Sequence, residues 1–208
     1  MARRQSTPCA EDTRERLMRL AARAFGAQGY TATTMRQIAD QAGIEAASIY
    51  YHFASKEDLV DAVMEHGAER IVRHIYRCMD ALATGATAEE SFKAALIGQL
   101  SGLVQYGDYA FARGRLHEQL PEKVQQRQLR RRERHQAFWD DLLHRLRDEG
   151  YLREDVNLAL CRVFVLGTIN SALNWFDPQK GTAKAVVDEF CGIFFEGVRP
   201  RGQGTAEA

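Results

Sequence analysis

The sequence predicts an all-α protein, and three observations support this fold class. Only four prolines interrupt the 208 residues, and they leave long stretches rich in alanine, leucine, glutamate, glutamine and arginine, which favour helix. Apolar residues recur at helical spacing along these stretches. No run of alternating β-branched residues indicates a strand, and no internal repeat is present. A chain of this length can form one large domain, or a small domain and a larger one.

The first two predicted helices have clear ends. The first starts near Glu11 and finishes at Gly29, a typical residue just after a helix. One of its faces carries apolar residues at i, i+3, i+4, i+7 and i+8, namely Leu17, Leu20, Ala21, Ala24 and Phe25. The second helix follows Thr34, which stands three residues before Gln37 as in a capping box, and Gly43 ends it after two turns.

A short third helix and a long fourth one follow. The third covers about residues 46–53, where Ile49 and Phe53 are four apart and can face inward together. The segment "SKEDL" then starts the fourth helix, with Ser55 as its N-cap and acidic residues in its first turn. This helix is expected to run to about Ala83, where a linker of glycine, threonine and alanine begins.

The rest of the chain predicts five more helices, which makes about nine in all. They are expected at residues 88–105, 108–119, 122–149, 156–176 and 182–198. Glycines and prolines between them mark the breaks.

Composition excludes several classes of protein. The formal net charge is zero, so no global basic field marks a nucleic-acid partner. The four cysteines form no C-x-x-C pair and no cluster with histidine, so we expect no metal site, no redox site and no cofactor. The N-terminus has no apolar signal segment, and no stretch of 18 apolar residues could span a membrane. We therefore expect a soluble, cytoplasmic protein.

The second and third helices, joined by a tight glycine turn, have the pattern of a helix-turn-helix. If Ile49 and Phe53 face the core, the opposite side of the third helix faces outward and would lie in the DNA major groove. That side carries Ala46, Ala47, Tyr50 and Tyr51. Alanine methyl groups can contact thymine methyl groups there, and the tyrosine hydroxyls can reach base edges or phosphate oxygens.

The run "TTMRQIADQAGIEAASIYYHFASKEDLV" resembles the DNA-binding segment of the tetracycline-repressor (TetR) family of bacterial transcriptional regulators. The resemblance is strong over residues 11–60, whereas beyond them only the helical layout and the length agree. It implies a helix-turn-helix DNA-binding domain with an N-terminal arm at residues 1–60. A long fourth helix would join this to a larger helical domain for ligand binding and dimerisation at residues 61–208.

The resemblance also implies roles for single residues. Thr34 would hold a phosphate at the start of the second helix, where the helix dipole favours an anion. Ala46, Ala47 and Tyr50 would face bases. The DNA backbone would be contacted by Ser48, Tyr51, His52 and Lys56. Glu45 departs from the family pattern, which often has a small hydroxyl residue there.

Alternatives remain for several of these residues. Tyr50 could cover the core, His52 could be a packing residue, and Lys56 could be a solvated lysine. Residues 1–60 carry eight Lys and Arg against seven acidic residues, so DNA binding must depend on where the positive groups lie.

The last two helices are apolar almost all round, which indicates burial on every side. In the TetR family two C-terminal helices dimerise as a four-helix bundle, so the resemblance implies a homodimer. The dimerisation residues expected are Phe164, Ile169, Phe176, Phe190 and Phe194. The alternative is burial within a single domain.

A basic stretch at residues 113–134 could hold an anionic ligand, although most such stretches are solvated helix faces. Further residues and the helical layout carry a second resemblance: Leu120-Pro121, Gly150, Leu173-Asn174-Trp175 and Pro178. Through them the C-terminal half loosely resembles TetR-family members that respond to acyl-coenzyme A thioesters. The ligand-binding residues expected are Leu100, Leu103, Phe111, Arg130, Arg134, Phe138, Trp139 and Trp175. The apolar side chains would surround an acyl chain and the arginines would bind phosphates.

These inferences together predict a ligand-responsive transcriptional repressor without enzymatic activity. It would bind palindromic operator DNA as a dimer and release it when a small hydrophobic or acyl-CoA-type ligand binds. The alternatives are a helical ligand-binding scaffold and a regulator that responds to an uncharged hydrophobic drug or metabolite. A helix-turn-helix enzyme would need a catalytic cluster that the sequence does not display.

Overall fold

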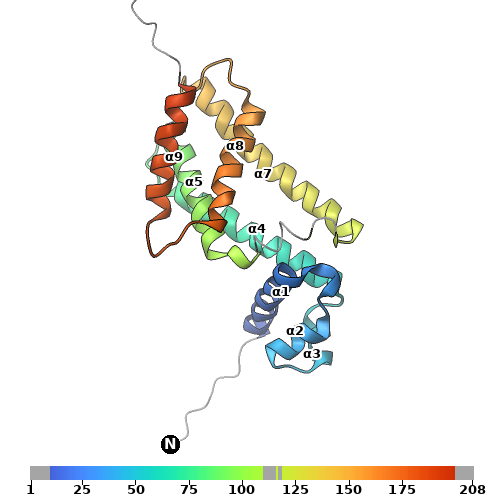
Figure 1. Ribbon diagram of the computed structural model, residues 1–208. Helices are drawn as coiled ribbons and strands as arrows, with labels where there is room; N and C mark the ends of the chain where they lie inside the picture. Colours follow the sequence, from blue (N-terminus) through green and yellow to red (C-terminus); the bar gives the residue numbers. More distant parts are fainter. Residues whose placement is uncertain (1–9, 110–115, 117–118, 200–208) are drawn as a thin grey trace, which may run out of the picture. The chain divides into compact units, whose positions relative to one another are not determined.

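The computed structural model describes residues 10–109, 116 and 119–199, and within them the chain forms helices and no strand, which confirms the all-α fold class (Figure 1). The elements are α1 (Ala10–Ala32), α2 (Met35–Ala42), α3 (Ala46–His52), α4 (Lys56–Asp80), α5 (Ala88–Gln105), α7 (Glu122–Asp148), α8 (Leu158–Ser171), the 3-10 helix η2 (Ala172–Asn174) and α9 (Ala183–Val198). Most of the helix expected at 108–119 lies outside the described residues. No described helix combines the length and the apolar character that crossing a membrane requires.

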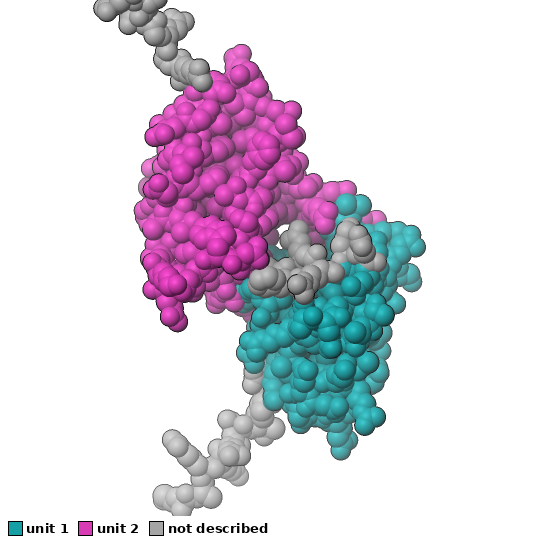
Figure 2. Space-filling model, in the orientation of Figure 1, with its two compact units in different colours: residues 1–69, 106–129 teal, residues 70–105, 130–208 magenta. Residues whose placement is uncertain are grey.

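The chain divides into two compact units, each built from two segments of sequence (Figure 2). Unit 1 contains residues up to 69 together with 106–129, and unit 2 contains 70–105 together with 130 onward. This division shows which residues pack together, but it does not show which residues bind DNA or a ligand. The functional division at residue 60 therefore remains a prediction.

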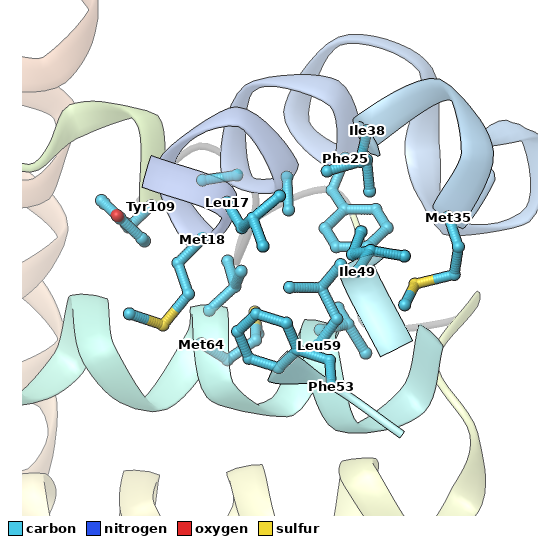
Figure 3. Close-up of a cluster of buried hydrophobic side chains, with 14 of the residues drawn as sticks. Leu17, Met18, Phe25, Met35, Ile38, Ile49, Phe53, Leu59, Met64 and Tyr109 are labelled. Carbon is cyan, nitrogen blue, oxygen red and sulfur yellow. The ribbon is translucent and has the colours of Figure 1, made fainter. Parts of the chain in front are cut away.

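The core of unit 1 draws on all four N-terminal helices (Figure 3). Leu17 and Phe25 of α1, Ile38 of α2, Ile49 of α3 and Leu59 of α4 are fully buried in it. The expected inward direction of Ile49 and of Phe53 is thereby confirmed.

A second segment, distant in sequence, completes this core. Tyr109, Leu116, Leu120 and Val124 belong to the same cluster of buried side chains. At Gly67 of α4 the ring of Tyr109 packs so closely that an added Cβ would lie 2.5 Å from the Cβ of Tyr109. Unit 1 is therefore larger than the three-helix domain of a helix-turn-helix protein.

In unit 2, α5 is the central helix, and it packs against α8 and α9. Phe92 of α5 contacts the rings of Trp139, Phe194 and Phe195 at centroid distances of 5.6–6.1 Å. Two glycines bring α5 against the α4 backbone, because a Cβ at Gly98 would lie 2.5 Å from the Cα of Ile75. This close crossing fixes the second half of α4 in unit 2.

We predict that Gly98→Ala destabilises the protein by roughly 1–3 kcal/mol, because its new methyl group meets backbone atoms that cannot rotate away. Gly102→Ala serves as the graded comparison, since its Cβ would lie 3.0 Å from the Cα of Ile71 and should cost less. Urea denaturation followed by circular dichroism measures both. Equal stability of the two variants and the wild type would contradict the close crossing.

Candidate functional site

The start of α2 is fixed by a reciprocal capping box. The side-chain oxygen of Thr34 accepts a hydrogen bond from the Gln37 N–H at 3.2 Å, and the Thr34 N–H donates to Gln37 Oε1 at 2.9 Å. The expected cap is confirmed. The Thr34 hydroxyl also lies 3.0 Å from Gln37 Oε1, so the side chain predicted to hold a phosphate is already engaged within the helix start.

A left-handed glycine makes the turn between α2 and α3. Gly43 has φ 65° and ψ 35°, a conformation that an L side chain adopts only with strain. Its N–H donates to the Asp40 carbonyl, and the Ile44 N–H donates to the Ala39 carbonyl. These bonds satisfy the last carbonyls of α2 and allow the chain to enter α3 at once.

The side of α3 opposite Ile49 is open to solvent. Tyr50 is 55% exposed and Tyr51 is 85% exposed. Ala46, Ala47 and Ser48 are also exposed, so these five residues, predicted to contact bases or the DNA backbone, share one accessible helix surface. Glu45 occupies the N-cap position of α3 but makes no side-chain capping bond.

His52 and Lys56 flank this surface and are both half-buried. The His52 ring packs edge-on against Tyr51, with centroids 5.3 Å apart. The Lys56 ammonium lies 4.2 Å from the centre of the Tyr30 ring and donates to the Thr31 carbonyl at 3.4 Å. Burial lowers the pKa of Lys56. Lys56 is therefore held in place by α1, and its three donors leave capacity for another acceptor.

Several residues predicted to bind a ligand lie inside unit 2. Leu100, Leu103 and Trp139 are buried. Phe138 is half-buried, with its ring 5.5 Å from that of Trp139 and 5.8 Å from that of Tyr76.

The other predicted ligand residues lie differently. Trp175 is 58% exposed, and its indole N–H donates to Ser171 Oγ. Arg130 and Arg134 are exposed on α7. Phe111 lies outside the described residues. The structure thus buries Leu100, Leu103 and Trp139 and half-buries Phe138, whereas Trp175 is exposed.

A polar group that sequence reasoning missed lies among these apolar side chains. Gln99 is almost fully buried, and its amide nitrogen donates to Asn170 Oδ1 at 3.1 Å. Its amide oxygen lies 3.3 Å from Nε2 of His135, which also lies 3.2 Å from the indole nitrogen of Trp139. The only signal in the sequence is one glutamine within the apolar run of α5.

The predicted dimerisation residues have unequal exposure. Phe164 is 68% exposed, whereas Ile169 is buried within its own chain. Phe176, Phe190 and Phe194 are half-buried. The large apolar side chains exposed on α8 and α9 are Leu160, Val163, Phe164 and Ile193.

No group of three His, Cys, Asp or Glu side chains that could hold a metal ion occurs in the described part of the chain. Burial raises the pKa of the Cys161 thiol to about 11 and that of Cys191 to about 12. Neither thiol is therefore a reactive thiolate at neutral pH.

The helix-turn-helix with an exposed recognition face defines a DNA-binding regulator, and comparison with known proteins identifies its family. A model described as "Bacterial regulatory proteins, tetR family" matches residues 17–63. A model described as "Tetracyclin repressor-like, C-terminal domain" matches residues 85–198, which is more than half of the chain. The chain therefore belongs to the TetR family.

Relatives along the whole chain agree with this assignment. The transcriptional repressor KstR2 of Mycobacterium tuberculosis is 28% identical over 191 residues, which cover 91% of this chain and 94% of the relative. The solved structure of the ketosteroid transcriptional regulator KstR2 of Mycobacterium tuberculosis has a TM-score of 0.78 at 25% identity, covering 95% of this chain and 100% of that one. The regulator PfmR of Thermus thermophilus shares the fold, with a TM-score of 0.76 at 22% identity over 94% of this chain and 100% of its own.

These relatives are transcriptional regulators and not enzymes. The chain is accordingly a ligand-responsive, DNA-binding transcriptional repressor of the TetR family. Regulators of this family bind operator DNA as dimers and respond to small molecules.

Proposed function

We propose that this repressor reads a palindromic operator through the exposed face of α3 and releases it when a hydrophobic or acyl-CoA-type ligand binds the other domain. The observation that supports the DNA part is the open surface formed by Ala46, Ala47, Tyr50 and Tyr51 opposite the buried Ile49. In this proposal Ala46, Ala47 and Tyr50 face bases. Thr34, Ser48, Tyr51, His52 and Lys56 contact the DNA backbone.

Release follows from differential binding. A ligand that binds the DNA-free arrangement more tightly shifts the population away from the DNA-bound one, by no more than the ratio of its two affinities. Residues 1–60 would carry the DNA contacts and residues 61–208 the ligand and dimer contacts.

Replacing Tyr50 by alanine is expected to cost on the order of 1–3 kcal/mol of binding to the preferred duplex, if the side chain reads a base edge. Replacing Lys56 by alanine should weaken binding to all sequences alike. It should also reduce the salt slope, which is the steepness with which the logarithm of the binding constant falls with the logarithm of salt concentration, by about one. Tyr76→Ala is the control, because Tyr76 is a tyrosine of similar exposure, 50%, on a different helix. Selection from random-sequence DNA supplies the duplex, and fluorescence anisotropy measures binding. Equal loss in the Tyr50 and Tyr76 variants would contradict the assignment.

The dimer is proposed to form through α8 and α9. On α8 the exposed positions Leu160, Val163, Phe164 and Gly167 follow the spacing of one helix face. Nothing lies within 4 Å of a Cβ built at Gly167 or at Gly192 of α9, so these faces have room for a partner helix. A contiguous apolar face of this kind is typical of a protein interface.

We predict that Phe164→Glu converts the dimer to monomers and weakens operator binding at least tenfold, because a buried carboxylate would be left unpaired in the interface. Ala137→Glu, at an exposed position of α7, should leave the dimer intact. Sedimentation velocity at micromolar concentration distinguishes these results. A wild type that sediments as a monomer would exclude the interface.

The proposed ligand has an apolar body and an anionic end. Leu100, Leu103, Phe138 and Trp139 supply an apolar environment for the body, and Phe111 and Trp175 are further candidates. Arg130 and Arg134 are exposed and one turn apart on α7, so both guanidinium groups are accessible to phosphates. One solved relative is described as a ketosteroid transcriptional regulator, so a polycyclic body should be tested beside straight acyl chains.

Octanoyl- and palmitoyl-coenzyme A are expected to raise the melting temperature of the wild type and to release the operator. The free acids and coenzyme A alone should have little effect. The double variant Arg130→Ala, Arg134→Ala should lose most of this response, whereas Arg132→Ala, which changes another exposed arginine of α7, should retain it. A steroid response that equals the thioester response would instead favour an uncharged hydrophobic ligand, and an equal response to the free acid would exclude a requirement for the coenzyme A phosphates.

A further inference from the structure

A nearly buried carboxylate lies on α4, the helix that follows the helix-turn-helix. Asp61 is 8% exposed, and its neighbours Val60 and Val63 are fully buried in the core of unit 1. A buried carboxylate is costly unless it is paired and hydrogen-bonded. Asp61 therefore requires partners among the groups that face it.

Two of these groups come from the start of α7. Arg127 Nε lies 3.0 Å from Asp61 Oδ2, and Gln128 Nε2 donates to Asp61 Oδ1 at 3.4 Å. They are among the contacts that Asp61 makes. Val124 lies one turn before these two residues on the same helix, and it is fully buried in the unit 1 core. The buried side chain of Val124 and the polar contacts of Arg127 and Gln128 with Asp61 thus hold this end of α7 in unit 1, beside α4.

Gln119, which lies just before α7, contacts the end of α1. The Thr31 N–H donates to Gln119 Oε1 at 3.3 Å, and the Thr31 carbonyl accepts from Lys56 at 3.4 Å. Gly29 allows this approach, because a Cβ there would lie 2.7 Å from Gln119 Oε1. Residues 119–128 therefore contact both α1 and α4, the two helices that hold Lys56 beside α3.

We infer that Asp61 and Arg127 form a positioning pair for DNA binding: their ion pair sets the place of α4, and thereby of Lys56 and α3, without touching DNA. The inference rests on the proposed role of α3 and Lys56 as DNA contacts. It also gives Arg127 a different role from Arg130 and Arg134, which we propose to bind the ligand phosphates, because the Arg127 guanidinium is already paired with Asp61 of α4.

Two other roles for Arg127 give different results. A phosphate contact or a long-range charge effect would weaken DNA binding when Arg127 is neutralised and strengthen it when Asp61 is neutralised. A purely structural role would lower stability throughout the protein. A positioning pair requires both partners, so either neutral variant should weaken binding, and their effects should not add.

The experiment compares Asp61→Asn, Arg127→Gln, the double variant and the control Arg132→Gln, using the duplex that the wild type selects from random DNA. Both single variants should lower affinity roughly five- to twentyfold, and the double variant should be no weaker than the weaker single. The salt slope should stay unchanged, and Arg132→Gln should lie within twofold of the wild type. Stronger binding by Asp61→Asn, additive losses, or a salt slope reduced by about one in Arg127→Gln would overturn the inference.

Hydrogen exchange in DNA-free protein gives a second readout that needs no operator. Peptides covering residues 46–52 should exchange faster in both single variants and in the double variant, while peptides covering residues 183–198 should not change. Uniform acceleration, or none, would overturn the inference. If the wild type selects no DNA sequence, the proposed function fails, and the exchange result still decides whether the pair positions α3.

Discussion

A recognition helix of seven residues cannot stand alone in water, and this constraint governs the design of unit 1. Helix α3 exists because Ile49 and Phe53 are buried against α1, α2 and α4. Burial of one face leaves the other exposed, so the packing that stabilises α3 also presents Tyr50 and Tyr51. The buried face therefore stabilises α3, and the DNA contacts that we propose lie on the opposite, exposed face, so the core sets the direction of the tyrosines.

Local chemistry fixes the ends of these helices, and the sequence predicted it well. The capping box of Thr34 and Gln37 and the left-handed turn at Gly43 involve residues within a few positions of each other, so their spacing alone reveals them. The assignment of these segments as helices was also correct, because the spacing of apolar residues that indicates a helix is likewise local. Boundaries were less accurate, since the helix expected at 156–176 ends at Ser171 and continues as the 3-10 helix η2.

Contacts between distant segments could not be predicted from spacing. The pairs Asp61–Arg127 and Gln99–Asn170 join residues more than sixty positions apart, and no local pattern relates them. Ile169 illustrates the limit for an apolar helix. Its periodicity indicated burial, but a sequence cannot tell whether a partner subunit or a helix of the same chain covers a given face, and in the structure Ile169 is buried within its own chain.

The charge distribution explains why placement matters more than total charge in this repressor. With zero net charge, and near balance over residues 1–60, no strong positive field draws the protein to DNA. We expect the affinity to come from a few preorganised contacts. Lys56, which we propose as one of them, is held by the Tyr30 ring and the Thr31 carbonyl. A few contacts per half-site give weak binding on their own, but two linked half-sites bind far more tightly because the second is engaged at high effective concentration. In the proposed palindromic mode, weak half-sites would make DNA binding sensitive to how the two subunits are held together, which is a condition for control by a ligand that contacts no DNA.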